Sequence, residues 1–504
     1  MLFKSTGFVI NLLEKIFKSN FHATGLENIP PNPTIFVASH FTRAEAFILP
    51  YILYKYTIRR VRSLADDKVF VGKLGEYLEK METISTHNPK RNHIILSDLM
   101  TGRRDWLIYP EGIMVKDKKI SKKQNYIVHS YNNKKRTIFT GSAVLALKTA
   151  LYKKRYLAAT KNNNQQELER LAKEFTIAKG KNVSLLNTMI VPVNITYYPV
   201  RPGPNRLKNT LQKLFKISIA RIHEEIEIES NILSKSDVII NFAKPIDIAE
   251  YIKSAQKFSD SLSLLPNQIK TNLLIKFFRH RLTNLFMQRI YDNICLHFDH
   301  IFALTILHHN SDEIELDDFK RLLYLNVMQS KELQKYHIHK PMRQGVYKIL
   351  INKKYKYFDN VFALAQKQNI LTLQENIVTI NRKHLNRKVD FHSIRLENTL
   401  MVFANEASLL DDVVNICKNN AKKDQIALAH DLLDRLIKQD TDLFYSQYKK
   451  YFNEKESKPT SIGCPFYLDS GNNDIAIVLS HGYKSAPVEV RELASYIYNY
   501  LGVC

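Results

Sequence analysis

Short apolar runs alternate with helix-like stretches over the first half of the chain. Runs rich in β-branched and aromatic residues are typical of buried strands, and they cover residues 34–39, 106–109, 189–197 and 238–242. Between them, apolar positions recur at helical spacing over residues 44–56, 141–154 and 165–179. This alternation predicts an α/β layer structure for a first domain that covers residues 1–255.

The hydrophobic pattern changes after residue 255. Helical periodicity covers residues 273–306, 316–328 and 425–448, which predicts a mainly helical domain over residues 256–452. Inside it, a predicted helix over residues 358–368 precedes two short apolar runs, 370–373 and 377–380. This helix and hairpin resemble a winged-helix fragment, although the same arrangement is common in modules that do not bind nucleic acid.

The last part of the chain begins with a polar segment, residues 453–471, whose Pro and Gly content predicts a linker. Residues 472–504 then combine an apolar run at 475–479, Ser480-His481-Gly482 and an amphipathic stretch. They resemble the first strand and helix of an α/β-hydrolase, whose His-Gly loop helps to form the oxyanion hole. Because the chain contains no Gly-x-Ser-x-Gly motif, we expect a truncated hydrolase unit without activity, and a fragment of a longer protein.

Composition narrows the choice of partners. The chain has 504 residues with 74 Lys and Arg against 49 Asp and Glu, a formal net charge of +25. Such a charge favours phosphate-bearing partners, either nucleic acid or an anionic membrane, unless the lysines are simply solvated surface. The four cysteines are widely spaced, which excludes a disulfide framework and a zinc knuckle and indicates a reducing cytosol.

Hydropathy predicts no membrane-spanning helix. The longest charge-free run, residues 182–200, contains two prolines and three asparagines, and part of it is a predicted strand. Residues 1–21 have apolar positions at helical spacing, several lysines and no small-residue cleavage site, so we expect no signal peptide. They form either an interfacial helix on acidic lipid or a helix that packs on its own domain.

One histidine has the setting of a catalytic base. His40 directly follows the predicted strand 34–39, and Glu45 comes five positions later at the start of a predicted helix. A carboxylate in that place can orient an imidazole and stabilise its protonated form. The spacing alone does not identify the catalytic pair, because five pairs in the chain share it. These pairs are His22–Glu27, His40–Glu45, His93–Asp98, His308–Glu313 and His392–Glu397.

The order of motifs distinguishes the pair that contains His40. Downstream, the predicted strand 106–109 ends in Pro110-Glu111-Gly112, and a later predicted strand carries Val191-Pro192-Val193. In this order the motifs resemble those of the glycerolipid acyltransferase family, which includes the glycerol-3-phosphate and lysophosphatidate acyltransferases. The resemblance covers about residues 20–245.

The resemblance implies a direct acyl transfer. His40 would be the general base that takes the proton from a glycerol hydroxyl while the hydroxyl attacks an acyl thioester, and Glu45 would orient it. Glu111 and Gly112 would contact the acceptor, and Pro192 would shape the acyl or thioester region. Acyl-CoA or acyl carrier protein would act as co-substrate, with no metal and no other cofactor.

The chain departs from the family at the carboxylate that orients His40 and at the block that binds the acceptor. The family carries Asp where this chain has Glu45, and its Gly-x-x-aromatic-x-Arg block is replaced by residues 81–86, which contain no arginine. Arg91, shortly after this block, and Lys116, the first cation after Pro-Glu-Gly, are therefore candidates for binding the substrate. The basic run over residues 116–136 is expected either to be a solvated loop or to meet headgroup or donor phosphates.

Taken together, the sequence predicts a cytoplasmic enzyme on the inner face of an anionic membrane. It would acylate a glycerol phosphate or lysophospholipid in phospholipid synthesis or remodelling, with nucleic acid not expected as a partner. Two alternatives stay open: a lipid hydrolase or thioesterase that lacks its catalytic half, and a basic winged-helix nucleic-acid-binding protein. Acceptor, donor, chain length and oligomeric state are not determined by the sequence.

Overall fold

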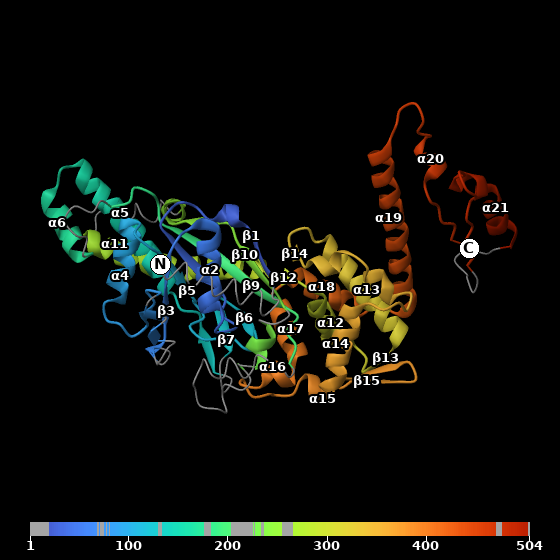
Figure 1. Cartoon of the computed structure of the whole chain (residues 1–504), viewed down its shortest axis with the longest axis horizontal. Coiled ribbons are helices and arrows are strands. Elements are labelled where there is room, and N and C mark those ends of the chain that lie inside the picture. Colours follow the sequence, from blue (N-terminus) through green and yellow to red (C-terminus); the bar gives the residue numbers. More distant parts are fainter. Residues whose placement is uncertain are drawn as a thin grey trace.

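The computed structural model of the chain describes residues 20–67, 70, 75–76, 78–79, 81–129, 134–175, 183–202, 225, 227–232, 236–254, 266–469 and 476–501. An α/β unit with a central sheet is followed by a helical region that packs against it (Figure 1). Within the described residues, no helix is both long and apolar enough to cross a membrane.

The central sheet has eight strands in the order β1-β10-β9-β2-β5-β3-β4, with β11 added on β9. Their bounds are β1 Asn20–Thr24, β2 Thr34–Ala38, β3 Val61–Ala65, β4 Ile84–Ser85, β5 Asp105–Ile108, β9 Met189–Tyr198, β10 Asp237–Phe242 and β11 Ile246–Asp247. Strand β2 runs parallel to both β5 and β9, whereas β9 and β10 are antiparallel. The predicted α/β structure and its four predicted strands are confirmed.

Strand β2 lies in the middle of this sheet and is buried along its whole length. Both faces of such a strand are covered, so its sequence is a continuous apolar run rather than an alternating one. The helices of this unit are α2 Glu45–Thr57, α4 Arg91–Thr101, α5 Gly141–Lys161, α6 Gln165–Glu174 and α9 Ile248–Lys253. The three predicted helices are therefore present, although α6 ends earlier than expected.

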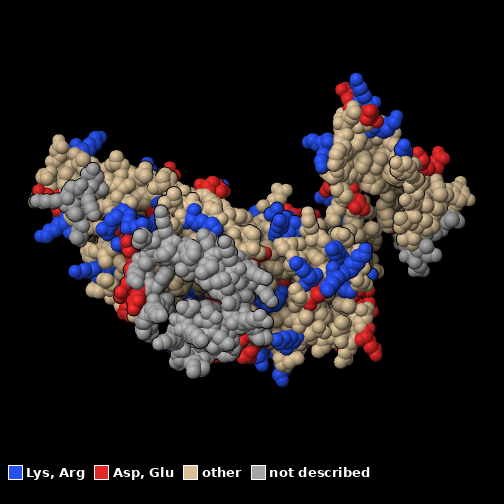
Figure 2. Space-filling view, viewed as in Figure 1, with Lys and Arg blue, Asp and Glu red and all other residues tan. Residues whose placement is uncertain are grey.

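The described residues of the basic run after Pro-Glu-Gly include regular secondary structure and are not a simple solvated loop. It contains a small antiparallel sheet with β6 Ile120–Lys122, β7 Tyr126–His129 and β8 Lys135–Thr137. Burial of Ile120, Tyr126 and Val128 on one side explains why the segment folds despite its charge. On the face of the molecule that Figure 2 shows, the Lys and Arg side chains of the described residues are scattered and do not merge into one patch.

The helical region contains eight helices that matter for the following description. They are α11 Asn267–Asp292, α12 Phe298–His308, α13 Leu316–Glu332, α14 Lys356–Lys367, α16 Ile394–Glu397, α17 Thr399–Ala407, α18 Asp411–Asn420 and α19 Gln425–Tyr451. The predicted helical stretch 273–306 is interrupted, because residues 295–296 form β12, which pairs with β14 (His337–Ile338).

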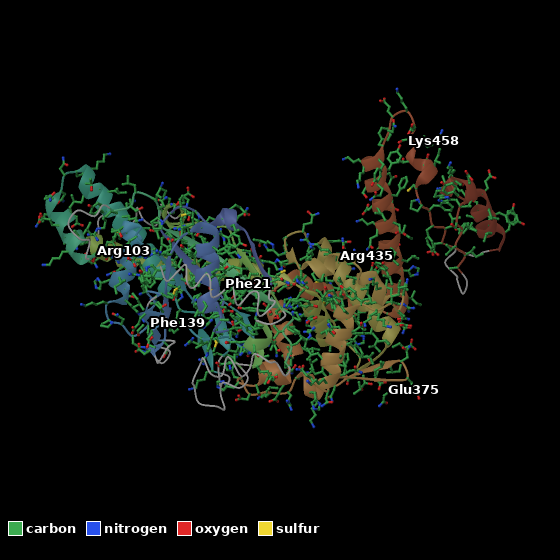
Figure 3. All side chains as sticks on the ribbon, viewed as in Figure 1. Phe21, Arg103, Phe139, Glu375, Arg435 and Lys458 are labelled. Atoms are coloured by element: carbon green, nitrogen blue, oxygen red, sulfur yellow. The ribbon has the colours of Figure 1, made fainter. Side chains whose placement is uncertain are left out.

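The predicted helix and hairpin are both present in this region. Helix α14 is followed by β15 (Leu371–Gln374) and β16 (Ile377–Ile380), and β16 also pairs with β13 (Glu313–Glu315). Glu375 lies in the turn of the hairpin, at an exposed tip of the molecule (Figure 3). The winged-helix interpretation of this arrangement stays a prediction.

The C-terminal part extends away from the rest of the molecule. Helix α19 projects from the helical region and is followed by α20 (Thr460–Gly463) and α21 (Arg491–Tyr496) (Figure 1). The strand expected at 475–479 is wrong over its described part, since residues 476–480 have no regular structure and Val478 is 92% exposed. No described strand lies beside them to pair with. The helix predicted for residues 1–21 falls almost entirely outside the described residues.

Candidate active site

His40 and Glu45 meet in the turn between β2 and α2. The imidazole Nδ1 lies 2.8 Å from Glu45 Oε2, with the His40 side chain 20% exposed and that of Glu45 1% exposed. Because the carboxylate accepts a hydrogen bond from Nδ1–H, the lone pair on Nε2 is left available to take a proton. The ring of Tyr109, from the end of β5, stacks on the imidazole with centroids 4.5 Å apart.

Glu45 is fixed by groups on both sides of the turn. Both of its oxygens accept the Phe41 N–H, at 3.1 and 3.0 Å, and Oε1 also accepts the Tyr197 hydroxyl at 2.9 Å. Its place at the first position of α2 puts a negative charge at the positive end of the helix. These contacts show how a glutamate reaches His40 where an aspartate is usual: the longer side chain folds back over the Phe41 amide.

Glu111, which is predicted to contact the acceptor, faces the interior and does not line the large pocket beside His40. Its side chain is 2% exposed, Oε2 accepts the His40 N–H at 2.8 Å, and Oε1 accepts the Tyr291 hydroxyl at 2.9 Å. Gly112 lies beside it with φ +66°, and a Cβ there would come within 2.4 Å of the Phe139 ring. The Pro-Glu-Gly turn therefore holds the backbone of His40, and its glycine allows Phe139 to pack closely.

Glu111 gives the fold a specific pH dependence. Burial raises the pKa of this carboxyl from 4.5 to about 7. Between these two values the folded protein holds a proton that the unfolded chain has lost, so the contribution of Glu111 to the free energy of unfolding falls by about 3 kcal/mol as pH rises from 4.5 to 7. We expect Glu111→Gln to remove this part of the slope in urea unfolding at pH 5 and pH 8. An equal change in the free energy of unfolding between pH 5 and pH 8 for variant and wild type would contradict this prediction.

Arg91, Lys116 and Pro192, which are predicted to bind or shape the substrate site, lie in three different environments. Arg91, at the start of α4, lines the large pocket beside His40 and donates from Nη1 to the carbonyl of Thr86. Lys116 is 1% exposed and pairs with Glu225 at 2.9 Å, away from that pocket. Pro192 is buried in β9 opposite Val37 of β2, also outside the pocket lining. Only Arg91 among these three is placed to meet a ligand in the pocket.

The pocket beside His40 has a volume of about 890 Å³. Its walls combine apolar side chains with guanidinium groups from three separate segments of the chain. The apolar part includes Phe47, Leu64, Ile95, Ile113 and Leu145, and the cations are Arg43, Arg91 and Arg136. Such a lining suits a ligand with a hydrocarbon part and an anionic part.

The pair His93–Asp98, which has the same spacing as His40–Glu45, is not formed. His93 Nδ1 lies 3.2 Å from the carbonyl oxygen of Glu174. Asp98 is fully buried and pairs instead with Arg62 at 2.8 Å and Arg103 at 2.6 Å. The two side chains leave α4 in different directions because five residues are nearly one and a half helical turns.

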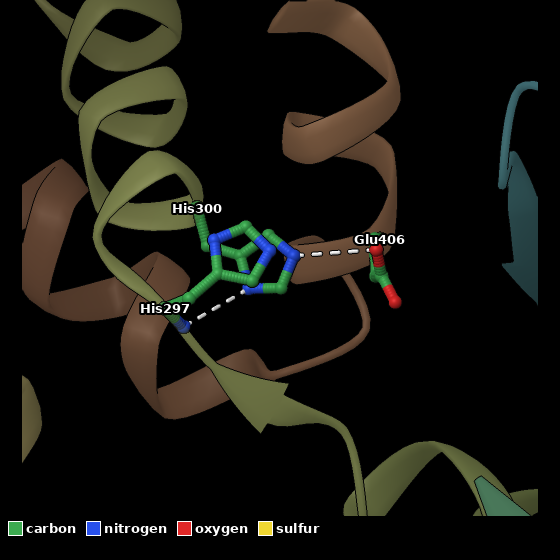
Figure 4. Close-up of side chains that lie close together, drawn as sticks. All are labelled: His297, His300 and Glu406. Carbon is green, nitrogen blue, oxygen red and sulfur yellow. Dashed lines mark hydrogen bonds and ion pairs between the residues drawn. The ribbon is translucent and has the colours of Figure 1, made fainter. Parts of the chain in front are cut away.

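A second cluster of titratable groups lies at the base of α12. The ligand atoms of His297, His300 and Glu406 lie within 4.8 Å of one another, and all three side chains are buried (Figure 4). Glu406 Oε1 already pairs with Lys118 at 2.5 Å, and Oε2 lies 3.3 Å from His300 Nε2. His300 Nδ1 accepts the His297 N–H at 3.4 Å, which places its proton on Nε2. These contacts form an ion-paired cluster in which Lys118 supplies the positive charge, and we assign no metal to it.

One family model matches the part of the chain that contains this site. The family model described as Acyltransferase matches residues 20–196, which contain His40, Glu45 and Glu111. Among solved structures, the chain is similar to the 1-acyl-sn-glycerophosphate (LPA) acyltransferase PlsC from Thermotoga maritima, with 14% sequence identity and a TM-score of 0.26, over 54% of this chain and 81% of that chain. No curated protein matches the chain.

Residues 20–196 are a domain of the acyltransferase family. The family resemblance read from the motif order is thereby confirmed over this range at the level of the acyltransferase family.

Sequence reasoning missed Tyr197 and Tyr291 as supporting residues of the site. Tyr197 lies in a predicted strand, but its contact with Glu45 spans 152 positions, and the contact of Tyr291 with Glu111 spans 180. Neither tyrosine belongs to a motif with a recognisable spacing. Their hydroxyl groups are found only when the strands and helix α11 are brought together.

Proposed function

We propose that the protein transfers a fatty acyl group from an acyl thioester to a hydroxyl of a glycerol phosphate or lysophospholipid. The observation that carries the proposal is the His40–Glu45 pair, 2.8 Å apart, at the wall of a pocket with both apolar and cationic lining. The match of residues 20–196 to the acyltransferase family supports it.

The chemistry follows from the state of His40. Nε2 takes the proton of the acceptor hydroxyl while the oxygen attacks the thioester carbonyl; the thiolate then leaves as the C–S bond breaks and takes the proton back from the His40 imidazolium. Glu45 stabilises the imidazolium that forms, and Tyr197 and the Phe41 N–H keep Glu45 in place. A thioester of coenzyme A or of acyl carrier protein would supply the acyl group.

The test is acyl transfer by the purified protein with a panel of substrates. Donors are acyl-CoA and acyl carrier protein thioesters, and acceptors are glycerol-3-phosphate, lysophosphatidate, other lysophospholipids and monoacylglycerol. We expect transfer to phosphate-bearing acceptors above transfer to monoacylglycerol. Thioester hydrolysis without transfer to any of these acceptors would contradict the proposal.

Arg91 is expected to bind an anionic part of a substrate. Its guanidinium lines the pocket on the side of α4, where a charge-assisted hydrogen bond to a phosphate is available. Arg91→Gln should raise the KM for the phosphorylated acceptor or donor about tenfold, with kcat nearly unchanged. Arg170→Gln removes an exposed cation of α6, outside the pocket, and serves as the matched control. Equal KM values for all three proteins would reject this role of Arg91.

We also propose that the enzyme works at an anionic membrane surface. The net charge of +25 and the Phe139 ring, which lines the pocket and is 51% exposed, support this setting. Co-sedimentation with vesicles of phosphatidylglycerol and phosphatidylcholine, compared with phosphatidylcholine alone, measures it. Equal binding to both kinds of vesicle would contradict an electrostatic attraction.

A further inference from the structure

Tyr291 reaches the catalytic centre from outside the residues that match the acyltransferase family. It lies near the end of α11, is 5% exposed, and its hydroxyl donates to Glu111 Oε1 at 2.9 Å. The family match ends at residue 196. The helical region therefore contributes a hydrogen bond to the turn that carries the Pro-Glu-Gly motif.

Glu111 links the Tyr291 hydroxyl to the backbone of His40 through its two carboxylate oxygens. Its other oxygen, Oε2, accepts the His40 N–H at 2.8 Å, and the Val115 N–H donates to the His40 carbonyl at 2.7 Å. Both peptide groups of His40 are thus held by the segment 111–115. A shift of the Glu111 carboxylate would move the backbone from which the imidazole extends.

We infer that Tyr291 is a positioning residue for His40, because its hydroxyl orients the Glu111 carboxylate that holds the His40 backbone. The inference rests on the proposed function, in which His40 is the base. Tyr291 itself does not touch the reacting atoms, so its effect on the reaction is exerted through Glu111.

Helix α11 is anchored in the two turns that precede Tyr291, which fixes the place of its hydroxyl. The Asn284 amide donates to the carbonyl of Gln124 at 2.8 Å, and Arg289 donates to the carbonyl of Lys244 at 2.8 Å. The ring of Tyr126, from β7, packs on the Tyr291 ring with centroids 5.4 Å apart. These contacts join α11 to the small sheet and to the segment after β10.

The charge state of Glu111 depends on a small set of groups. His40, Glu45 and Tyr291 act on it directly, Arg136 donates to its backbone carbonyl, and Lys118 and Glu406 face it across a cavity of about 30 Å³. Burial raises its pKa, while the hydrogen bonds from the His40 N–H and the Tyr291 hydroxyl lower it. Loss of the hydroxyl should therefore favour the protonated form, which is a poorer acceptor for the His40 N–H.

The test is Tyr291→Phe in the acyl-transfer assay over a range of pH. We expect the acid limb of kcat to move to higher pH and kcat at pH 6 to fall about tenfold, with both KM values nearly unchanged. Tyr324→Phe is the matched control: Tyr324 is 2% exposed on α13, and its hydroxyl donates to Gln439 at 3.2 Å, remote from the pocket. It should keep the wild-type profile. A wild-type kcat and acid limb in Tyr291→Phe would overturn the inference, as would an equal shift in Tyr324→Phe.

Glu111→Gln separates positioning from simple loss of packing. The amide oxygen can accept the His40 N–H and the amide nitrogen can donate to Tyr291, but the group cannot ionise. When Tyr291→Phe is added to Glu111→Gln, the acid limb of the kcat profile should therefore not shift any further. If Tyr291→Phe does not fold, Glu111→Gln alone decides: a displaced acid limb supports the inference and a wild-type limb overturns it.

His40→Ala distinguishes this inference from the proposed function. Undiminished transfer by His40→Ala would overturn the function and, with it, the role of Tyr291. An inactive His40→Ala together with a wild-type profile of Tyr291→Phe would overturn only the role of Tyr291.

Discussion

Replacement of His40 by alanine is expected to lower kcat for acyl transfer by about 10²–10⁴-fold, the usual contribution of a general base. The variant should fold normally, because Glu45 keeps its hydrogen bonds from the Phe41 N–H and the Tyr197 hydroxyl. The substrate KM values should change little, since the pocket retains its apolar walls and its arginines. Steady-state rates with a thioester donor and the best acceptor of the panel measure the effect.

Two other histidines provide controls for this prediction. His93, on α4, contacts the Glu174 carbonyl at 3.2 Å, and His93→Ala tests the pair that spacing alone could not exclude. His87 lines the same pocket as His40 but pairs with Asp67 at 3.2 Å. His87→Ala therefore tests whether loss of any imidazole from the pocket is enough to lower kcat. Both should retain kcat within a few-fold. A loss in His93→Ala comparable to that in His40→Ala would contradict the assignment of the base.

The second large effect concerns stability and arises from Arg395. This side chain of α16 is fully buried, and its Nη1 donates to the Phe41 carbonyl at 3.0 Å, directly after His40. Its charge also lowers the pKa of two buried carboxyls, Glu225 and Glu229, against the desolvation that raises them. Arg395→Met keeps an unbranched apolar stem but is shorter and lacks the guanidinium, and removal of one partner from buried opposite charges typically costs about 3–5 kcal/mol.

Denaturant unfolding of the full chain measures this cost. The matched control is Arg387→Met, because Arg387 pairs with Glu397 at 2.5 Å while both side chains are about half exposed. Exposed pairs of this kind contribute about 0–1 kcal/mol. Equal unfolding free energies for Arg395→Met and Arg387→Met would contradict the view that the helical region supports the catalytic turn through a buried charge.

Much of the α/β unit was predictable because its signals are local. Buried strands such as β2 and β9 are continuous apolar runs, and α2 and α5 show helical periodicity, so their existence and approximate bounds followed from the pattern. The small sheet β6-β7-β8 was not predicted, since its short strands alternate with lysines and resemble a solvated loop. The apolar run at 475–479 shows the opposite error, because a strand also requires a neighbour to pair with.

In the candidate site, too, some features could be predicted from the sequence and others could not. His40, Glu45 and Glu111 could be picked out because they end or begin predicted elements and occur in a fixed order. The sequence did not reveal the burial of Lys116 or the inward orientation of Glu111. Both depend on partners from distant segments, Glu225 for Lys116 and Tyr291 for Glu111. A cation that follows a motif in sequence can equally face a pocket or an internal carboxylate.

The sequence by itself determined the α/β alternation, the family of residues 20–196 and the histidine–carboxylate pair, since each depends on residues a few positions apart or on motif order. Only the tertiary structure decided what surrounds this pair. The supporting contacts of Tyr197, Tyr291 and Arg395 span 152, 180 and 354 positions, and no local pattern records them. A hydrogen bond or ion pair depends on distances of about 3 Å, which are fixed only when separate elements pack together.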